Sequence, residues 1–304
     1  MKELTVERAG PLALVQDGGR FGVRHLGVTQ GGAMDPVSMG WANWLLGNDP
    51  GAAALEISLG GLTLRAGADG WLALSGADLD ARLDDEPLSR NAAFAIRAGQ
   101  RLSFGHPVKG VRAYLAVAGG IAGSPTLGSL ACVVREGLGG ADGEGRALAQ
   151  GDVIRWQGDT DSPRQLPNEI RMPLDMPPEL ALIQGAQSDY FAAASLFDAF
   201  NSDWQVDSRA DRMGIRLRGP QLDCRLSGMV SEGIPLGAVQ VPADGQPIVL
   251  MNDRQTVGGY PRLGALSPLA CARLAQCAPG ERVRMLPTTP ERAREAWRRQ
   301  LKCW

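Results

Sequence analysis

The segment Pro247–Arg262, PIVLMNDRQTVGGYPR, joins a run of apolar residues to a dense polar loop. The apolar half, Ile248 to Met251, has the composition of a buried strand. A second strand-like segment, Ile234 to Val241, precedes it across PADGQP, whose Asp-Gly step is typical of a β-hairpin turn. The sequence therefore predicts two paired strands here. The loop after them is either a polar hairpin turn or a loop that wraps a ligand.

The rest of the chain favours the same fold class. It has 304 residues, enough for one large domain or two, and it contains 40 Gly and 20 Pro among short apolar runs. We expect a mainly β fold with a few helices. The polar, Pro-rich segment 158–178 predicts a linker. We therefore expect an N-terminal β-rich domain at 1–166 and a C-terminal domain at 167–304, unless the two halves interleave.

Capping signals predict where the helices begin. A side-chain acceptor followed by proline, at the N-cap and first helical positions, marks three of these starts. The fourth start carries a serine cap alone. The predicted starts are Asp35-Pro36, with a stop at Gly47, then Ser188, Ser267-Pro268 and Thr289-Pro290.

Composition argues against several functional classes. The net charge of −2 gives no electrostatic case for binding nucleic acid or an anionic membrane. Five scattered cysteines without a CxxC pair and only two histidines argue against a zinc centre or a disulfide scaffold. The N-terminus lacks the apolar core of a signal peptide, and no run reaches transmembrane length. We expect a cytoplasmic protein.

Several self-contained enzyme motifs are missing from the sequence. It has no GxxxxGK[ST] phosphate loop, no GxGxxG after a strand and no GxSxG nucleophile elbow. It also has no Met-Lys-Met-type segment for biotin attachment. We therefore expect any biotin to be carried on another chain.

Three polar clusters could carry chemistry. The first, QDGGRFGVRHLGVTQGGAMD, offers His25 for proton transfer near neutral pH, or is a solvated loop in which Asp35 only caps a helix. The second places Arg212 before a strand, where it could bind an anion or form surface salt bridges. The third is the opening loop with Gln240, whose amide either contacts a ligand or is satisfied in the core.

These clusters resemble a known family. The segments QDGGRFGVRHLGV, DRMGIRL and GAVQVPADGQPIVLMNDRQTVGGYPRLG are similar to the KipA-like proteins, also described as the C subunit of 5-oxoprolinase or as the subdomain A and B region of biotin-dependent carboxyltransferases. The resemblance extends to about Thr289. One departure is Leu130-Ala131-Cys132, where the family pattern leads us to expect an Arg-Ser-Thr type run. Any substrate contact by that loop is therefore in doubt.

The resemblance implies a fold and an activity. It implies two β-barrel-like domains, at least one of them cyclophilin-like. It implies a subunit of an ATP-dependent 5-oxoprolinase, which opens the lactam of 5-oxoproline to glutamate together with a KipI-like subunit and a third subunit. One alternative is a carboxyl transfer subunit of the urea carboxylase/allophanate hydrolase type that uses biotin on another chain. Another is a non-enzymatic regulator that binds a KipI-like kinase inhibitor.

Both reactions require a poorly reactive amide to be polarised by fixed donors. Within the resemblance we expect Arg24 and Arg212 to bind anionic groups and His25 and Asp253 to transfer protons. We expect no metal ligands. The remaining candidates are substrate-binding residues, namely Asp35, Gln240, Gln255, Thr256 and Tyr260.

Overall fold

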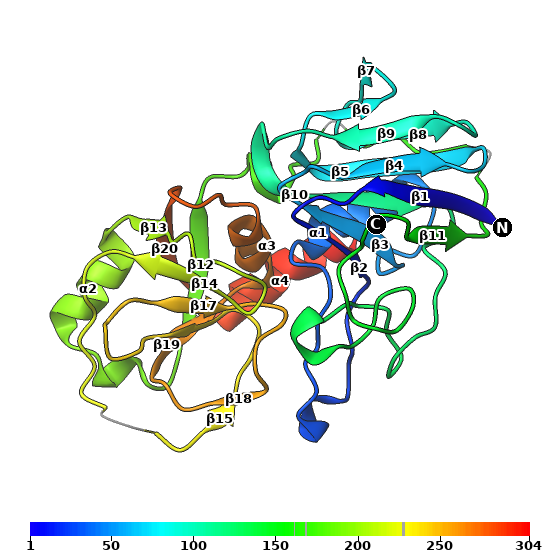
Figure 1. The fold of residues 1–304 in the computed structure, drawn as a ribbon. Helices are drawn as coiled ribbons and strands as arrows, with labels where there is room; N and C mark the ends of the chain where they lie inside the picture. The colour runs from blue at the N-terminus through cyan, green and yellow to red at the C-terminus, as the bar shows by residue number, and fades with distance from the viewer. Residues whose placement is uncertain (161, 168, 227–228) are drawn as a thin grey trace. The chain divides into compact units, whose positions relative to one another are not determined.

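The protein is mainly β, which confirms the predicted fold class (Figure 1). The computed structural model describes residues 1–160, 162–167, 169–226 and 229–304. It comprises two compact units. The first contains Met1–Phe21, Gly31–Asp175 and Trp304, and the second contains Gly22–Gln30 and Met176–Cys303. The division after Asp175 falls inside the predicted linker, of which Asp161 and Asn168 lie outside the described residues.

The first unit is built on two antiparallel sheets. In spatial order, the six-stranded sheet contains β11 (Val153–Trp156), β1 (Lys2–Arg8), β4 (Thr63–Ala66), β9 (Arg101–Phe104), β6 (Ala81–Leu83) and β7 (Glu86–Pro87). The five-stranded sheet contains β2 (Leu12–Gln16), β3 (Ala54–Ser58), β10 (Lys109–Val117), β5 (Gly70–Asp78) and β8 (Ala92–Ile96).

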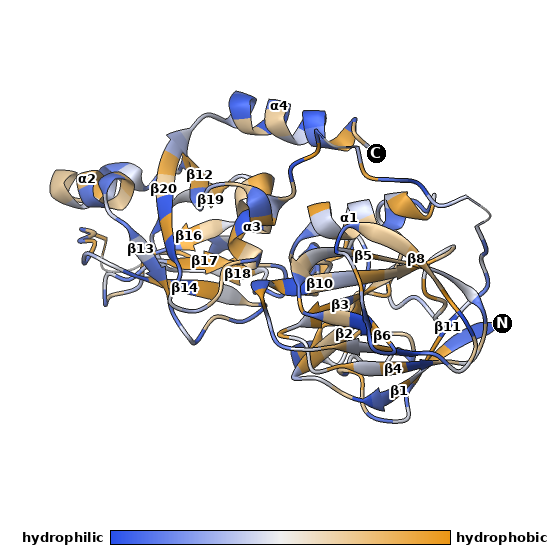
Figure 2. Ribbon diagram, turned by 90° about the horizontal axis from the view of Figure 1, so that it is seen from above, coloured by the Kyte–Doolittle hydropathy of each residue, from blue (hydrophilic) through white to orange (hydrophobic). Residues whose placement is uncertain are grey.

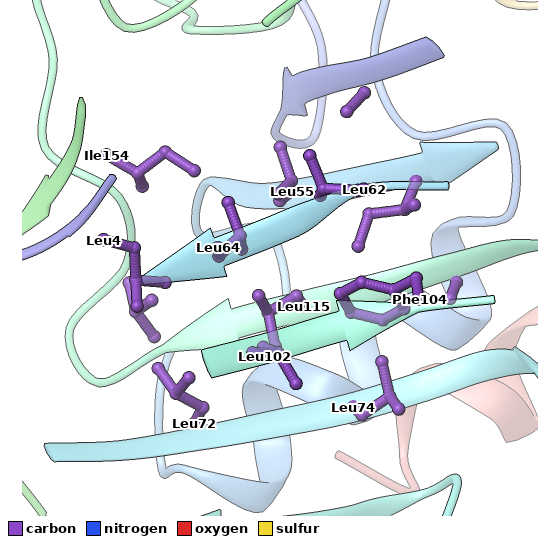
Figure 3. Packing of buried hydrophobic residues seen from close by; sticks show 14 of the residues in the cluster. Leu4, Leu55, Leu62, Leu64, Leu72, Leu74, Leu102, Phe104, Leu115 and Ile154 are labelled. Carbon is purple, nitrogen blue, oxygen red and sulfur yellow. The ribbon is translucent and has the colours of Figure 1, made fainter. Parts of the chain in front are cut away.

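The core of the first unit lies between these sheets. Leu64 and Leu102 of the six-stranded sheet join Leu74 and Leu115 of the five-stranded sheet in one buried cluster (Figure 3). Because side chains alternate across a strand, the neighbouring Tyr114 points to the opposite face. There it belongs to a second buried cluster with residues of α1 (Pro36–Leu45). The five-stranded sheet is therefore buried on both faces.

The segment that departs from the family pattern is part of this packing. Leu130, Ala131 and Cys132 are all buried. The Leu130 amide donates to Asp17 at 2.6 Å, and Nη2 of Arg20 donates to the Ala131 carbonyl at 2.5 Å. Two residues of the first polar cluster thus hold the backbone of this segment. Two short 3-10 turns, η2 (Val134–Glu136) and η3 (Pro173–Asp175), complete the first unit.

The second unit is a closed barrel. Its strands follow the order β12 (Glu179–Gln184), β19 (Arg262–Leu266), β16 (Ala238–Gln240), β17 (Ile248–Leu250), β14 (Gly214–Arg218), β13 (Trp204–Val206) and β20 (Arg282–Thr288), and a parallel pairing of β20 with β12 closes the ring. The predicted hairpin is confirmed, since β16 and β17 pair with Val239 opposite Val249. A separate ribbon pairs β15 (Glu232–Gly233) with β18 (Val257–Gly258).

The helices test the capping signals. Asp35, Ser267 and Thr289 cap α1, α3 (Pro268–Ala275) and α4 (Pro290–Leu301), as predicted. The Ser188 prediction is wrong. Ser188 begins only the 3-10 turn η4 (Ser188–Tyr190), and α2 (Ala193–Asn201) follows without a side-chain cap. The extended Phe191 breaks the segment between the two, and it is buried there.

The apolar residues are placed as these elements require. Figure 2 shows β17 in hydrophobic colours and α4 in mixed colours, in keeping with a barrel strand and a surface helix. No helix in the described ranges is both long enough and apolar enough to span a membrane.

Candidate functional site in the second unit

The polar loop after β17 turns back into the protein. Asn252, Asp253 and Arg254 are only 7%, 6% and 4% exposed. A solvated hairpin turn would expose such side chains, whereas buried polar groups require partners. The loop is therefore part of the internal architecture of the second unit, and its partners define the candidate site.

Asp253 forms a two-pronged ion pair with Arg212. Nε and Nη2 of Arg212 lie 2.9 Å from the two carboxylate oxygens of Asp253, and the Asp253 amide donates to the Arg212 carbonyl at 2.9 Å. Both side chains are buried. The charge of Arg212, the predicted anion binder, is therefore neutralised by Asp253, the predicted proton-transfer residue. Arg212 fixes the loop to the segment before β14, and Asp253 stands as an ionised partner of that arginine.

Arg24 and Arg254 meet at a single carbonyl. Arg24 belongs to η1 (Arg24–Leu26), in the N-terminal loop that the second unit contains. Its Nη2 donates to the Ile234 carbonyl and, at 3.1 Å, to the Thr256 carbonyl. Nε of Arg254 donates to the same Ile234 carbonyl at 3.1 Å. Two guanidinium groups therefore lie close together at the start of the segment after β15.

This arginine pair carries excess positive charge. Arg254 also donates to the Met251 carbonyl at 3.1 Å and to Oε1 of Gln30 at 3.3 Å. Every one of these acceptors is neutral, and within the described residues neither arginine forms a salt bridge with a carboxylate. Burial, and then repulsion by Arg24, lower the pKa of Arg254 to about 10, so it remains charged at neutral pH. An uncompensated buried charge is costly, and an anion bound at Arg24 would offset it.

Two side-chain amides each have one buried atom without a hydrogen-bond partner among the described residues. Gln240, on β16, is 2% exposed, and its Nε2 has no acceptor among the described residues. A Cβ at Gly258 would lie only 2.9 Å from that nitrogen, so glycine leaves room beside it. Oε1 of Gln255 is likewise buried and finds no donor in the described part of the chain. A ligand or a water molecule could therefore accept a hydrogen bond from Gln240 Nε2 or donate one to Gln255 Oε1.

The other predicted residues occupy different settings. His25 is exposed on the same turn as Arg24. Thr256 contributes its backbone carbonyl, and Tyr260 is 54% exposed at the wall of a pocket of about 490 Å³ that also includes Cys224. Asp35 belongs to the first unit, where its carboxylate accepts the Val37 and Ser38 amides as the N-cap of α1.

Sequence reasoning missed Arg254 and the Ile234 carbonyl. Arg254 stands between two predicted residues, but nothing in a loop sequence shows which side chain turns inward. The available signal was indirect, because a lone arginine next to a strand end needs a partner if it is buried. Of the described residues, no group of three His, Cys, Asp or Glu side chains is arranged to hold a metal ion.

Comparison with known proteins identifies relatives across almost the whole chain. The model of the carboxyltransferase domain, subdomain A and B, matches residues 26–287. The chain is 40% identical to the C subunit of 5-oxoprolinase from Escherichia coli, over 96% of this chain and 94% of that protein. It is 35% identical to the C subunit of 5-oxoprolinase from Haemophilus influenzae, over 90% and 87%.

A solved structure shares the fold. The crystal structure of the Kluyveromyces lactis urea carboxylase superposes with a TM-score of 0.92 at 27% identity, covering 99% of this chain and 28% of that one. The urea carboxylase is thus a much longer protein that contains a similar region. On the family match and the near-complete coverage of its bacterial relatives, this chain belongs to the carboxyltransferase domain, subdomain A and B, family.

Proposed function

We propose that the chain is a subunit of an ATP-dependent 5-oxoprolinase. The observation that carries the proposal is its 40% identity to the C subunit of the E. coli enzyme over 94% of that protein's length. We further propose a cytoplasmic assembly with a KipI-like subunit and a third subunit. Because the sequence lacks a phosphate loop, we assign ATP to a partner or to a site shared with one.

The arginine pair suits the substrate of this reaction. Lactam opening adds water across the ring C–N bond: the water oxygen bonds to the carbonyl carbon, and the nitrogen leaves with a proton as the new amino group. The substrate carboxylate does not react, so it is available as a handle. Nε and Nη1 of Arg24 make no hydrogen bond within the described residues. We assign these two donors to the substrate carboxylate. Arg254, which shares the Ile234 carbonyl with Arg24, adds positive charge nearby.

The remaining predicted roles follow from this arrangement. His25, exposed beside Arg24, is our candidate for proton transfer. We assign Gln240 Nε2 as a donor toward the substrate carbonyl, because it is a buried donor in need of an acceptor. Asp253 and Arg212 would keep the loop in place through their ion pair.

Reconstitution tests the proposal. The chain is purified with its candidate KipI-like and third subunits, and glutamate release from 5-oxoproline is measured with and without ATP. We expect turnover only with all three chains and ATP. A well-folded complex that releases no glutamate would falsify the assignment.

A matched pair of variants tests the site. Arg24→Gln removes the guanidinium whose Nε and Nη1 we assign to the substrate carboxylate, and we expect it to raise KM for 5-oxoproline roughly tenfold or more, with a smaller effect on kcat. Arg284→Gln is the control, because Arg284 forms an exposed ion pair with Asp203 on the barrel surface. Equal KM values for Arg24→Gln and Arg284→Gln would show that Arg24 does not bind the substrate.

The second candidate function is carboxyl transfer of the urea carboxylase type. The structural similarity to the K. lactis urea carboxylase favours it, although this chain corresponds to only 28% of that protein. In this case the biotin would be supplied by another chain. Activity that depends on a biotinylated carrier would establish the second function over the first. Assembly with a KipI-like protein but no turnover of either kind would favour a regulatory role.

A further inference from the structure

A second pocket of the second unit holds a charged pair among mostly apolar walls. It has a volume of about 270 Å³ and is lined by the end of β12, the following loop, β15 and β19. The residues that matter for its chemistry are Gln187, Glu232 and Arg262, with Ile183 and Pro235 on its walls. None of these residues is part of the site assigned above.

Three polar side chains in the pocket hold one another in position. Nη2 of Arg262 pairs with the Glu232 carboxylate, and Nη1 donates to the Gly233 carbonyl at 3.3 Å. Nε2 of Gln187 donates to both Glu232 oxygens at 3.2 and 3.3 Å. Oε1 of Gln187 accepts the Arg262 amide at 2.8 Å. The charged groups are therefore oriented before any ligand arrives, which lowers the entropic cost of binding.

The network leaves one donor without an acceptor and one carboxylate open to solvent. Nε of Arg262 is buried, and no acceptor among the described residues contacts it. The Glu232 side chain is 44% exposed, so its carboxylate can accept further hydrogen bonds. Buried donors without acceptors are uncommon in folded proteins and call for an explanation. A ligand that brings an acceptor to the Arg262 guanidinium and a donor to Glu232 would add the contacts that this network lacks.

We propose that this pocket binds a small molecule that carries both a carboxylate and an N–H or ammonium group, that is, an amino acid or a cyclic amide acid. The ligand carboxylate accepts from Arg262, and its nitrogen donates to Glu232. The arginine and the glutamate neutralise each other, so the pocket disfavours a multiply charged phosphate. Its volume is below the range of drug-sized ligand sites and suits a molecule of this size.

The pocket is connected to the arginine pair through one short segment. Glu232 and Gly233 bind Arg262, and the next residue, Ile234, presents the carbonyl shared by Arg24 and Arg254. A ligand that forms a hydrogen bond with Glu232 would therefore affect the position of the Ile234 carbonyl, which accepts from Arg24. The proposal is independent of the proposed function, because it concerns a different pocket and is tested by binding to the single chain without turnover.

Calorimetric titration of the full chain with L-glutamate, 5-oxoproline and glutarate tests the proposal. Glutarate matches glutamate in its carboxylates but lacks the nitrogen. We expect glutamate and 5-oxoproline to bind and glutarate to bind at least about tenfold more weakly, since it cannot donate to Glu232. Arg262→Gln and Glu232→Gln should each weaken binding roughly tenfold to a hundredfold.

The controls separate this pocket from the other site and from misfolding. All variants are repeated in an Arg24→Gln background, which removes binding at the arginine pair, and there Arg262→Gln and Glu232→Gln should still weaken binding relative to Arg24→Gln alone. Arg284→Gln should leave binding unchanged, and Arg262→Lys, which retains the charge, should bind better than Arg262→Gln at the same thermal midpoint. The proposal is wrong if no probe binds, if glutarate equals glutamate, or if Arg262→Gln binds normally. A reconstituted complex that lacks turnover while the pocket still binds refutes only the proposed function.

Discussion

At the scale of single residues, the buried Arg212–Asp253 pair changes how mutations of the polar loop should be interpreted. A proton-transfer residue and an anion binder are expected to face substrate, but these two side chains face each other. Replacing one partner leaves the other buried and charged. Loss of activity in such a variant would therefore report on folding as much as on chemistry.

We accordingly predict a stability effect for Asp253→Asn. The free energy of unfolding should fall by about 3–5 kcal/mol, because Arg212 loses its buried carboxylate partner. The double variant Arg212→Met/Asp253→Leu should recover most of this loss, since neither charge remains. Urea denaturation measures both. Asp203→Asn, which breaks an exposed pair, is the control and should lose less than about 1 kcal/mol. A loss in Asp253→Asn no larger than in this control would contradict the prediction.

A second residue-scale prediction concerns Asp35, which the resemblance assigns to substrate and which the structure places at the N-cap of α1. Asp35→Ala should lower stability by about 1–2 kcal/mol, and Asp35→Ser should retain most of it because serine also caps helices. Thermal denaturation together with the reconstituted assay separates the two roles. If Asp35→Ser is stable and fully active, capping is sufficient; if it is stable and inactive, Asp35 binds substrate.

At the scale of elements, a turn between neighbouring strands depends on one carboxylate. Asp207 follows β13 and is buried. It accepts the Arg209 amide at 2.8 Å and the Arg209 side chain at 2.9 and 3.0 Å, and it also pairs with Arg218 of β14. These contacts, chiefly the hydrogen bonds from Arg209, hold the pKa of Asp207 well below its usual range. The turn is thus stabilised by a charge that acid removes.

This predicts a pH-dependent stability. Because the folded-state pKa of Asp207 is lowered, its contribution is fully present above the unfolded-state pKa of about 4 and is lost progressively as pH falls from there through the folded-state pKa. Asp207→Asn should cost about 1–3 kcal/mol at neutral pH, and the difference from the wild type should shrink in acid. Urea denaturation of both proteins at pH about 7 and about 3 measures it. A difference that does not change with pH would count against the ionised carboxylate.

At the scale of the whole molecule, each unit has its own core. The core of the first unit lies between its two sheets, and the second unit closes a barrel of its own. Chains with more than one core often unfold in more than one step. The chain nevertheless passes between the units more than once, since Gly22–Gln30 belongs to the second unit while its flanks belong to the first.

We predict that calorimetric unfolding of the chain is not two-state. The calorimetric enthalpy should exceed the van't Hoff enthalpy. Leu64→Ala, in the first core, should lower the midpoint of one transition, and Val249→Ala, in the barrel, that of the other. Each core truncation should cost roughly 2–5 kcal/mol. One transition that both variants shift equally would show instead that the units unfold together.

Much of the fold could be predicted from the sequence, because the signals involved are local. The Asp-Gly turn predicts the β16–β17 hairpin, and Asp35-Pro36 and Ser267-Pro268 predict the starts of two helices. These signals depend on the conformational preferences of neighbouring residues. The Ser188 prediction failed because the burial of Phe191 overrode a local capping preference.

Local patterns in the sequence are enough to predict the fold class, most helix starts and the segments rich in polar groups. The partners of those polar groups follow only from how the chain folds. Arg212 pairs with Asp253, 41 residues away, and Arg24 reaches Ile234, 210 residues away. Such contacts depend on how the barrel closes and on which way each loop side chain turns. No local preference encodes either, because the free energy of burying a charge is set by all the groups brought around it.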